Sequence, residues 1–264
     1  MKVFGVFFIL FFVLSLGATA QVHDHIQIAR QNMPAVVAVN VLQQDGSTFT
    51  GTGFVLTPDG IIATNRHVLD NSLYLNITFN NGTVSGEAVP LVQSDLVDLA
   101  LLQIQAQHLP HVILGDSDTV QPGQTITVIG NPRRLQNTVT SGIVSQVRLQ
   151  KNGTLWHQIS APISPSSSGS PVFNAQGEVI AVAFASLNAP ENQNLNFAIP
   201  SNYIKELVQQ YGLQLPSTTT PTSSSKHPFL HHIQKSWNIL KRLLHRWFGS
   251  TEILHEDTHE TQNR

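Results

Sequence analysis

The chain has 264 residues, of which 41% are hydrophobic and 11% are charged, so a wholly disordered protein is excluded. Its formal net charge of −2 at pH 7 gives no reason to expect nucleic-acid binding. There is no cysteine, which excludes disulfides, a cysteine nucleophile and a thiolate metal site. The histidines do not combine with acids at the spacing of metal ligands, so we expect neither a metal nor a cofactor.

Residues 1–20 have the pattern of a secretory signal. Lys2 gives a positive start, residues 3–16 are an apolar run, and Ala18-Thr19-Ala20 is a small-x-small cleavage site. An uncleaved membrane anchor is the alternative, but the run is short for a spanning helix. We therefore expect export with cleavage near Gln21, and a periplasmic or secreted mature protein.

Residues 21–215 form the expected folded domain. Short apolar runs alternate with turns rich in Gly, Asn, Asp and Pro, a pattern typical of an all-β barrel or sandwich. Helical patterns occur only at its ends, over residues 25–33 and 201–211, the second with Ser201 as its N-cap and Gly212 just past its end. The expected strands cover residues 36–41, 54–56, 61–64, 99–104, 125–129, 139–147, 171–173 and 179–184.

The remaining chain has a different composition. Residues 216–225 are almost all Ser, Thr and Pro, which predicts a flexible linker. Residues 226–248 are basic, with apolar residues three and four apart, which predicts an amphipathic helix. Residues 249–264 are polar and expected to be disordered. Three alternatives stay open for the helix: an anionic membrane surface, a partner protein, or packing on its own barrel.

Three residues suit hydrolysis by a serine nucleophile, which needs a base, a carboxylate to orient the base, and donors for the oxyanion. His67 follows a buried run, Asp98 begins another, and Ser168 lies in a turn of small residues before a third. Each alone is a weak signal, because a lone histidine, aspartate or serine is usually structural. Asp95 competes for the carboxylate role. The order His, Asp, Ser is that of the chymotrypsin arrangement.

Several ordered motifs resemble the HtrA/Deg-type trypsin-like serine proteases over roughly residues 26–211. They are Gly51-Thr52-Gly53-Phe54-Val55, Thr64-Asn65-Arg66-His67-Val68, Asp98-Leu99-Ala100-Leu101-Leu102, Leu114-Gly115-Asp116-Ser117-Asp118, Val128-Ile129-Gly130-Asn131-Pro132, Val139-Thr140-Ser141-Gly142-Ile143-Val144-Ser145 and Asn196-Phe197-Ala198-Ile199-Pro200-Ser201. The resemblance implies two six-stranded antiparallel β-barrels. It also implies an exported endopeptidase that cleaves unfolded or misfolded polypeptides through an acyl-enzyme.

The resemblance assigns roles to particular residues. His67 would be the base, Asp98 its orienter and Ser168 the nucleophile, and the backbone N–H groups of Ser166 and Ser168 would form the oxyanion hole. The family's motif has glycine where this chain has Ser166 and Ser170. These departures keep an alternative open, a catalytically inactive protease-like protein that binds partners through the cleft and the basic helix.

Specificity and assembly follow only from the resemblance. Leu195, Asn196 and Phe197 would lie near the primary specificity pocket, and the implied preference is a medium-sized aliphatic residue before the cut. Many family members carry a PDZ domain, whereas too few residues follow Tyr211 for one here. Family members often form trimers through their N-terminal segment. The corresponding segment, residues 21–33, is short, so a homotrimer stays open.

Overall fold

The computed structural model describes residues 25–131, 137–184 and 195–216. The predicted signal segment, basic helix and polar tail, and all of the predicted linker except Pro216, therefore lie outside the described residues. Among the described residues, no helix has the length and apolar character needed to cross a membrane.

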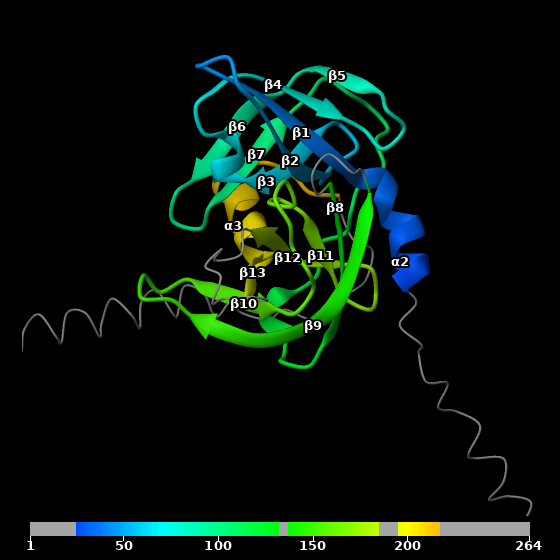
Figure 1. Ribbon diagram of the computed structural model, residues 1–264, viewed down its shortest axis with the longest axis vertical. Coiled ribbons are helices and arrows are strands. Elements are labelled where there is room, and N and C mark those ends of the chain that lie inside the picture. Colours follow the sequence, from blue (N-terminus) through cyan, green and yellow to red (C-terminus); the bar gives the residue numbers. More distant parts are fainter. Residues whose placement is uncertain (1–24, 132–136, 185–194, 217–264) are drawn as a thin grey trace, which may run out of the picture. The chain divides into compact units, whose positions relative to one another are not determined.

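The N-terminal part begins with α2 (His25–Asn32), followed by the 3₁₀ turn η1 (Met33–Ala35). Its strands form one antiparallel seven-stranded sheet in the order β5-β4-β1-β2-β3-β7-β6 (Figure 1). The 3₁₀ turn η2 (Arg66–Leu69) follows β3 and contains His67. The strands are β1 (Val36–Gln43), β2 (Thr48–Val55), β3 (Ile61–Asn65), β4 (Ser72–Thr78), β5 (Val84–Glu87), β6 (Val89–Ser94) and β7 (Leu99–Gln103).

The C-terminal part is a closed six-stranded barrel in the order β10-β13-β12-β11-β8-β9. Figure 1 shows β9 as a long curved strand beside β10. The 3₁₀ turn η3 (Ser117–Thr119) precedes the barrel and α3 (Asn202–Gln210) follows it. The strands are β8 (Thr125–Gly130), β9 (Thr138–Leu149), β10 (Leu155–Ile159), β11 (Pro171–Phe173), β12 (Val179–Phe184) and β13 (Asn196–Pro200).

The sequence predicts two six-stranded barrels, and the C-terminal one is present as a closed barrel. The N-terminal part differs, because it is a seven-stranded sheet. There β5 pairs with β4 and β6 pairs with β7, and the two strands are separated only by Ala88, whose N–H bonds to Leu75 O at 2.9 Å. Counted as one bent strand, β5 and β6 would close a six-stranded barrel. The β6–β7 ladder is also irregular, with a register shift between Pro90, which has no N–H to donate, and Val92.

Small and β-branched side chains fill the closed barrel. Its core includes Ile126, Val144, Val172, Ala181 and Ala198, all at most 1% exposed. Burying one Val or Ile side chain contributes roughly 1.5–3 kcal/mol, so this interior is a main source of stability in a chain without disulfides.

Both predicted terminal helices are present, with a difference in capping. Ser201 occupies the N-cap position of α3, but its side chain makes no capping bond. Its hydroxyl instead donates to Gly115 O at 3.2 Å, which joins the helix start to the segment before the closed barrel. Gly212 follows the helix with φ +65°, as expected past a helix end.

Candidate active site

The position of His67 is fixed by the strand before it. All residues of β3 are buried, and the chain then turns into η2. Two groups at this junction donate to the carbonyl oxygen of Asp98: the side-chain Nδ2 of Asn65 at 3.0 Å and the N–H of Arg66 at 3.2 Å. The backbone that carries His67 is therefore tied to the backbone of Asp98 before either side chain is considered.

The carboxylate of Asp98 is bound to His67 at two points. The N–H of His67 donates to Oδ1 at 2.9 Å, and Nδ1 of its ring lies 2.7 Å from Oδ2. An ionised carboxylate only accepts hydrogen bonds, so Nδ1 carries the hydrogen and Nε2 is the atom left to act as a base. Asp98 has φ +52°, a conformation that aspartate tolerates better than most residues.

Asp95, the competing carboxylate, contacts a different residue. Its Oδ1 lies 2.9 Å from Nε of Arg66, and its side chain is 89% exposed. Arg66 also pairs with Asp70 at 2.8 Å. Of the two aspartates, only Asp98 contacts the imidazole.

The residues around Ser168 form a tight loop, here called the serine loop (residues 164–170). It opens with a turn closed by Ser167 N–H donating to Ser164 O at 3.0 Å. Gly169 N–H and Ser170 N–H donate to Ala183 O and Ser167 O at 2.9 and 3.0 Å. By contrast, the N–H groups of Ser166 and Ser168 have no acceptor in the described part of the chain. Two unused donors on alternate residues are what an anion site requires.

The two serines that replace the family's glycines are both in demanding positions. Ser166 has φ +73° and follows Pro165, the geometry of a type II turn in which glycine is preferred at this place. Ser170 is fully buried, and its hydroxyl has no hydrogen-bond partner in the described chain. Both positions suit glycine better than serine. The positive φ of Ser166 and the unpaired buried hydroxyl of Ser170 each have an energetic cost.

The serine loop lies against the strands that lead to His67. Gly169 has φ +89°, and a Cβ there would meet Thr52 O at 1.9 Å and Thr64 Oγ1 at 2.5 Å. Only glycine allows this approach. The structure brings Ser168 and His67 to the same junction between the two parts, but describes no hydrogen bond between the Ser168 hydroxyl and the His67 ring. Such bonds are often long before a substrate binds.

The three residues expected at the specificity pocket are on or next to β13. Leu195 precedes the strand, and Asn196 is 4% exposed and donates from Nδ2 to Ala161 O at 2.8 Å. Phe197 packs against two aromatic residues that the sequence analysis did not identify. Its ring centroid lies 5.6 Å from that of Trp156 and 6.2 Å from that of Phe184.

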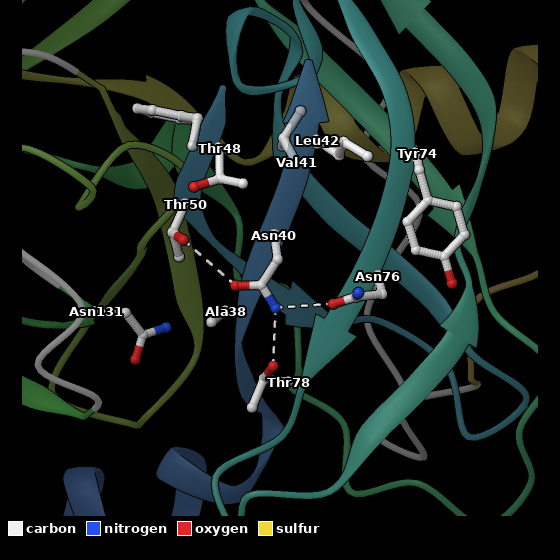
Figure 2. A pocket seen from close by; sticks show the side chains of 11 residues that line it. Ala38, Asn40, Val41, Leu42, Thr48, Thr50, Tyr74, Asn76, Thr78 and Asn131 are labelled. Atoms are coloured by element: carbon white, nitrogen blue, oxygen red, sulfur yellow. Dashed lines mark hydrogen bonds between the residues drawn. The ribbon is translucent and has the colours of Figure 1, made fainter. Parts of the chain in front are cut away.

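A separate hollow of ≈370 Å³ lies on one face of the N-terminal sheet. Figure 2 shows Asn40 at its centre, with dashed lines to side chains on both neighbouring strands. Asn40 Nδ2 donates to Asn76 Oδ1 and Thr78 Oγ1, and Thr50 Oγ1 donates to Asn40 Oδ1. None of His67, Asp98 and Ser168 lines this hollow, so we do not assign the reaction to it.

Thr52 is the residue near Ser168 that sequence reasoning missed. Its side chain is fully buried and bonds to the serine loop. The motif Gly51-Thr52-Gly53 resembles the family's glycine-rich strand, but the resemblance implies no role for its middle residue. The signal in the sequence is a threonine between two glycines. Glycines are common where chain segments pack closely, as they do at both Gly51 and Gly53.

Comparison with known proteins identifies the family of the chain. Residues 51–182 match the family described as the trypsin-like peptidase domain. Serine protease HTRA1 of Xenopus tropicalis is 32% identical over 225 residues, covering 80% of this chain and 47% of that protein. A probable periplasmic DegP-like serine endoprotease of Marinomonas sp. is 36% identical over 173 residues, covering 64% and 36%.

A solved structure gives the same result. The HtrA-type protease AlgW with a tripeptide superposes with a TM-score of 0.65 at 27% identity, covering 71% of this chain and 63% of that one. The chain therefore belongs to the family of trypsin-like peptidases, and the relatives that it matches are serine proteases of the HtrA type. It spans less than half the length of the two curated relatives named here.

Proposed function

We propose that this protein is a serine endopeptidase in which His67, Asp98 and Ser168 act as the catalytic triad. The observation that carries the proposal is the pair of hydrogen bonds from His67 to the Asp98 carboxylate. They hold the imidazole in the tautomer whose free Nε2 can accept a proton. The unused N–H groups of Ser166 and Ser168 support an oxyanion site beside it.

The reaction proceeds in two halves. Ser168 Oγ bonds to the carbonyl carbon of the substrate while its proton passes to His67 Nε2, and the electron pair of the C=O bond moves onto the oxygen. The carbon–nitrogen bond then breaks, and the leaving amine takes the proton from His67. Water attacks the resulting acyl-enzyme, loses a proton to His67, and releases the acid as the proton returns to Ser168. Asp98 orients the imidazole in both halves.

The substrates are polypeptides, as the peptide bound in the similar AlgW structure supports. Leu195, Asn196 and Phe197 border the pocket for the residue before the cut, and none of them is charged. An uncharged pocket favours a medium-sized aliphatic side chain over Lys or Arg, and unfolded or misfolded chains would expose such residues.

Export is part of the proposal. A curated relative is named as periplasmic, which agrees with the secretory pattern over residues 1–20. The homotrimer, and the binding of residues 226–248 to an anionic membrane or a partner protein, stay predictions from the sequence.

The test is labelling of the purified protein with a fluorophosphonate probe, with the adduct located by mass spectrometry. We expect an adduct on Ser168, lost in Ser168→Ala and in His67→Ala. Ser167→Ala is the matched control, since it removes the adjacent hydroxyl and should still be labelled. Hydrolysis of an unfolded polypeptide should follow the same pattern among the variants.

A second function is favoured by the two unusual serines. If the strained Ser166 and the unpaired hydroxyl of Ser170 keep the site closed, the protein would hold peptides without cutting them. Absence of any adduct in the wild type, together with peptide binding that survives Ser168→Ala, would favour this binding protein over the enzyme.

A further inference from the structure

Thr52, on β2 of the N-terminal sheet, is in direct contact with the serine loop of the other part of the fold. The β2–β3 ladder covers only Phe54 and Val55. At Thr52 the side of β2 that would face β3 pairs with the serine loop instead, because Thr52 N–H donates to Ser168 O at 2.9 Å. The side chain adds a second bond, from Thr52 Oγ1 to Ser166 O at 2.9 Å.

Every polar group of Thr52 has a partner. Its carbonyl oxygen accepts from Thr64 Oγ1 at 2.7 Å, and its Oγ1 accepts from Asn131 N–H at 3.0 Å. Because the Asn131 N–H occupies a lone pair of Oγ1, the hydroxyl hydrogen is left to point at Ser166 O. With the whole residue buried, water cannot replace these bonds, so the direction of the hydroxyl is well determined.

The two bonds to the loop act on either side of one peptide unit. The carbonyl of Ser166 belongs to the peptide unit before Ser167, and the carbonyl of Ser168 belongs to the unit after Ser168. The unit between them carries the Ser168 N–H, which is one of the two unused donors. Holding both neighbouring units fixes the direction of this N–H and the position of the Ser168 Cα.

We infer that Thr52 is a positioning residue for the oxyanion site, acting through the carbonyl oxygens of Ser166 and Ser168. The role matters more here than it would with glycine at position 166. A serine at φ +73° gains by leaving that conformation, and the Thr52 hydroxyl opposes the change. The inference rests on the proposed function, since only a working hydrolase uses the site.

The test compares three variants. Thr52→Val keeps the shape and loses the hydroxyl, and should lower kcat and the rate of fluorophosphonate labelling about 100-fold with a small change in KM, as expected for misplaced transition-state donors. Thr52→Ser keeps the hydroxyl and should stay within about threefold of wild type. Thr52→Cys, which keeps a side-chain atom but donates weakly, should fall between them and serves if Thr52→Val does not fold.

Thr57→Val is the matched control. Thr57 is also a buried threonine of the N-terminal part, and its Oγ1 likewise donates to one oxygen, of Asp59, and accepts one N–H, from Ile61 at 3.1 Å. None of its hydrogen bonds reaches the serine loop. It should lower the melting temperature as Thr52→Val does and leave kcat unchanged. If both variants lose activity in proportion to stability, the positioning role is wrong.

A second readout separates this inference from the proposed function. The backbone amide resonances of the non-proline residues in the range 164–170 should shift in Thr52→Val and not in Thr57→Val. If the wild type is not labelled but these resonances shift, the contact is confirmed and the proposed hydrolase fails. If the wild type is labelled on Ser168 and Thr52→Val is labelled equally fast, the positioning inference fails and the hydrolase stands.

Discussion

The Asp98 carboxylate receives both the backbone N–H and the ring Nδ1 of His67, at 2.9 and 2.7 Å. This double contact predicts the effect of Asp98→Asn. The amide would present its NH₂ to Nδ1 and stabilise the tautomer with hydrogen on Nε2, which cannot accept the proton of Ser168. We expect kcat to fall about 10⁴-fold with the fold retained, measured on a chromogenic peptide alongside circular dichroism.

Asp95→Asn is the control for this variant. Asp95 is exposed and pairs with Arg66, so its loss should change kcat less than about twofold and stability by at most about 1 kcal/mol. Equal losses of activity in the two variants would show that local charge, and not the contact with the imidazole, is what matters.

Ser166→Gly should stabilise the protein. The turn formed by residues 164–167 places Ser166 at φ +73°, where a residue with a Cβ is disfavoured by about 1–2 kcal/mol and glycine is not. Glycine also has more freedom to lose on folding, which offsets part of the gain. We expect the free energy of unfolding in urea to rise by about 1 kcal/mol, and the labelling rate of Ser168 to rise or stay equal.

Ser167→Gly is the neighbouring control. Ser167 has no positive φ, so glycine brings only its entropic cost, and stability should fall by about 0.5–1 kcal/mol. A loss of stability in Ser166→Gly would mean that the serine side chain makes a compensating interaction in solution.

Most of the fold could be predicted because its strands are bounded by strong turn residues. The runs that became β1, β3, β8 and β12 differ from their predicted limits by at most two residues. The patterns at β4, β5 and β6 are weaker, because these strands are only partly buried and their sequences contain no continuous apolar run. Their place in the sheet is decided by pairing with β1 and β7, which is tertiary information.

The same limit applies to the site. His67, Asp98 and Ser168 stand out because each lies at the end of an apolar run. Thr52 does not, since its importance comes from two carbonyl oxygens more than a hundred positions away in the chain. Trp156 and Phe184 do not stand out in the sequence for a similar reason, because only the barrel brings them to Phe197.

Ser170→Ala should be neutral or stabilising. The Ser170 hydroxyl is buried over Gly130 and has no partner in the described chain, and an unpaired buried hydroxyl costs about 1–3 kcal/mol. Removing the hydroxyl removes this cost but leaves a small void, which offsets part of the stabilisation. We therefore expect the free energy of unfolding in urea to rise by up to about 1 kcal/mol. Ser201→Ala is the matched control, since Ser201 is equally buried but donates to Gly115 O, and it should lose about 1 kcal/mol.

His157 should make the protein sensitive to acid. It lies on β10, is 1% exposed, and its Nδ1 has no partner in the described chain. Burial lowers the pKa of His157 from 6.5 to about 4. Between these values the unfolded chain binds a proton that the folded protein does not, so stability falls as pH falls from about 6.5 to about 4. The full effect is about 3 kcal/mol.

His157→Leu should remove this dependence, and urea unfolding at pH 4, 5, 6 and 7 measures it. A second group, Glu206, acts in the opposite direction. Burial, with a smaller contribution from Asp118, raises the pKa of Glu206 to about 7. The stability that protonated Glu206 contributes is therefore lost as pH rises from about 4.5 to about 7. The wild-type curve combines both effects, and the difference between wild type and His157→Leu isolates the histidine. His157→Leu should gain stability relative to wild type as pH falls. Parallel curves for His157→Leu and wild type would mean that His157 is protonated equally well in the folded and unfolded protein.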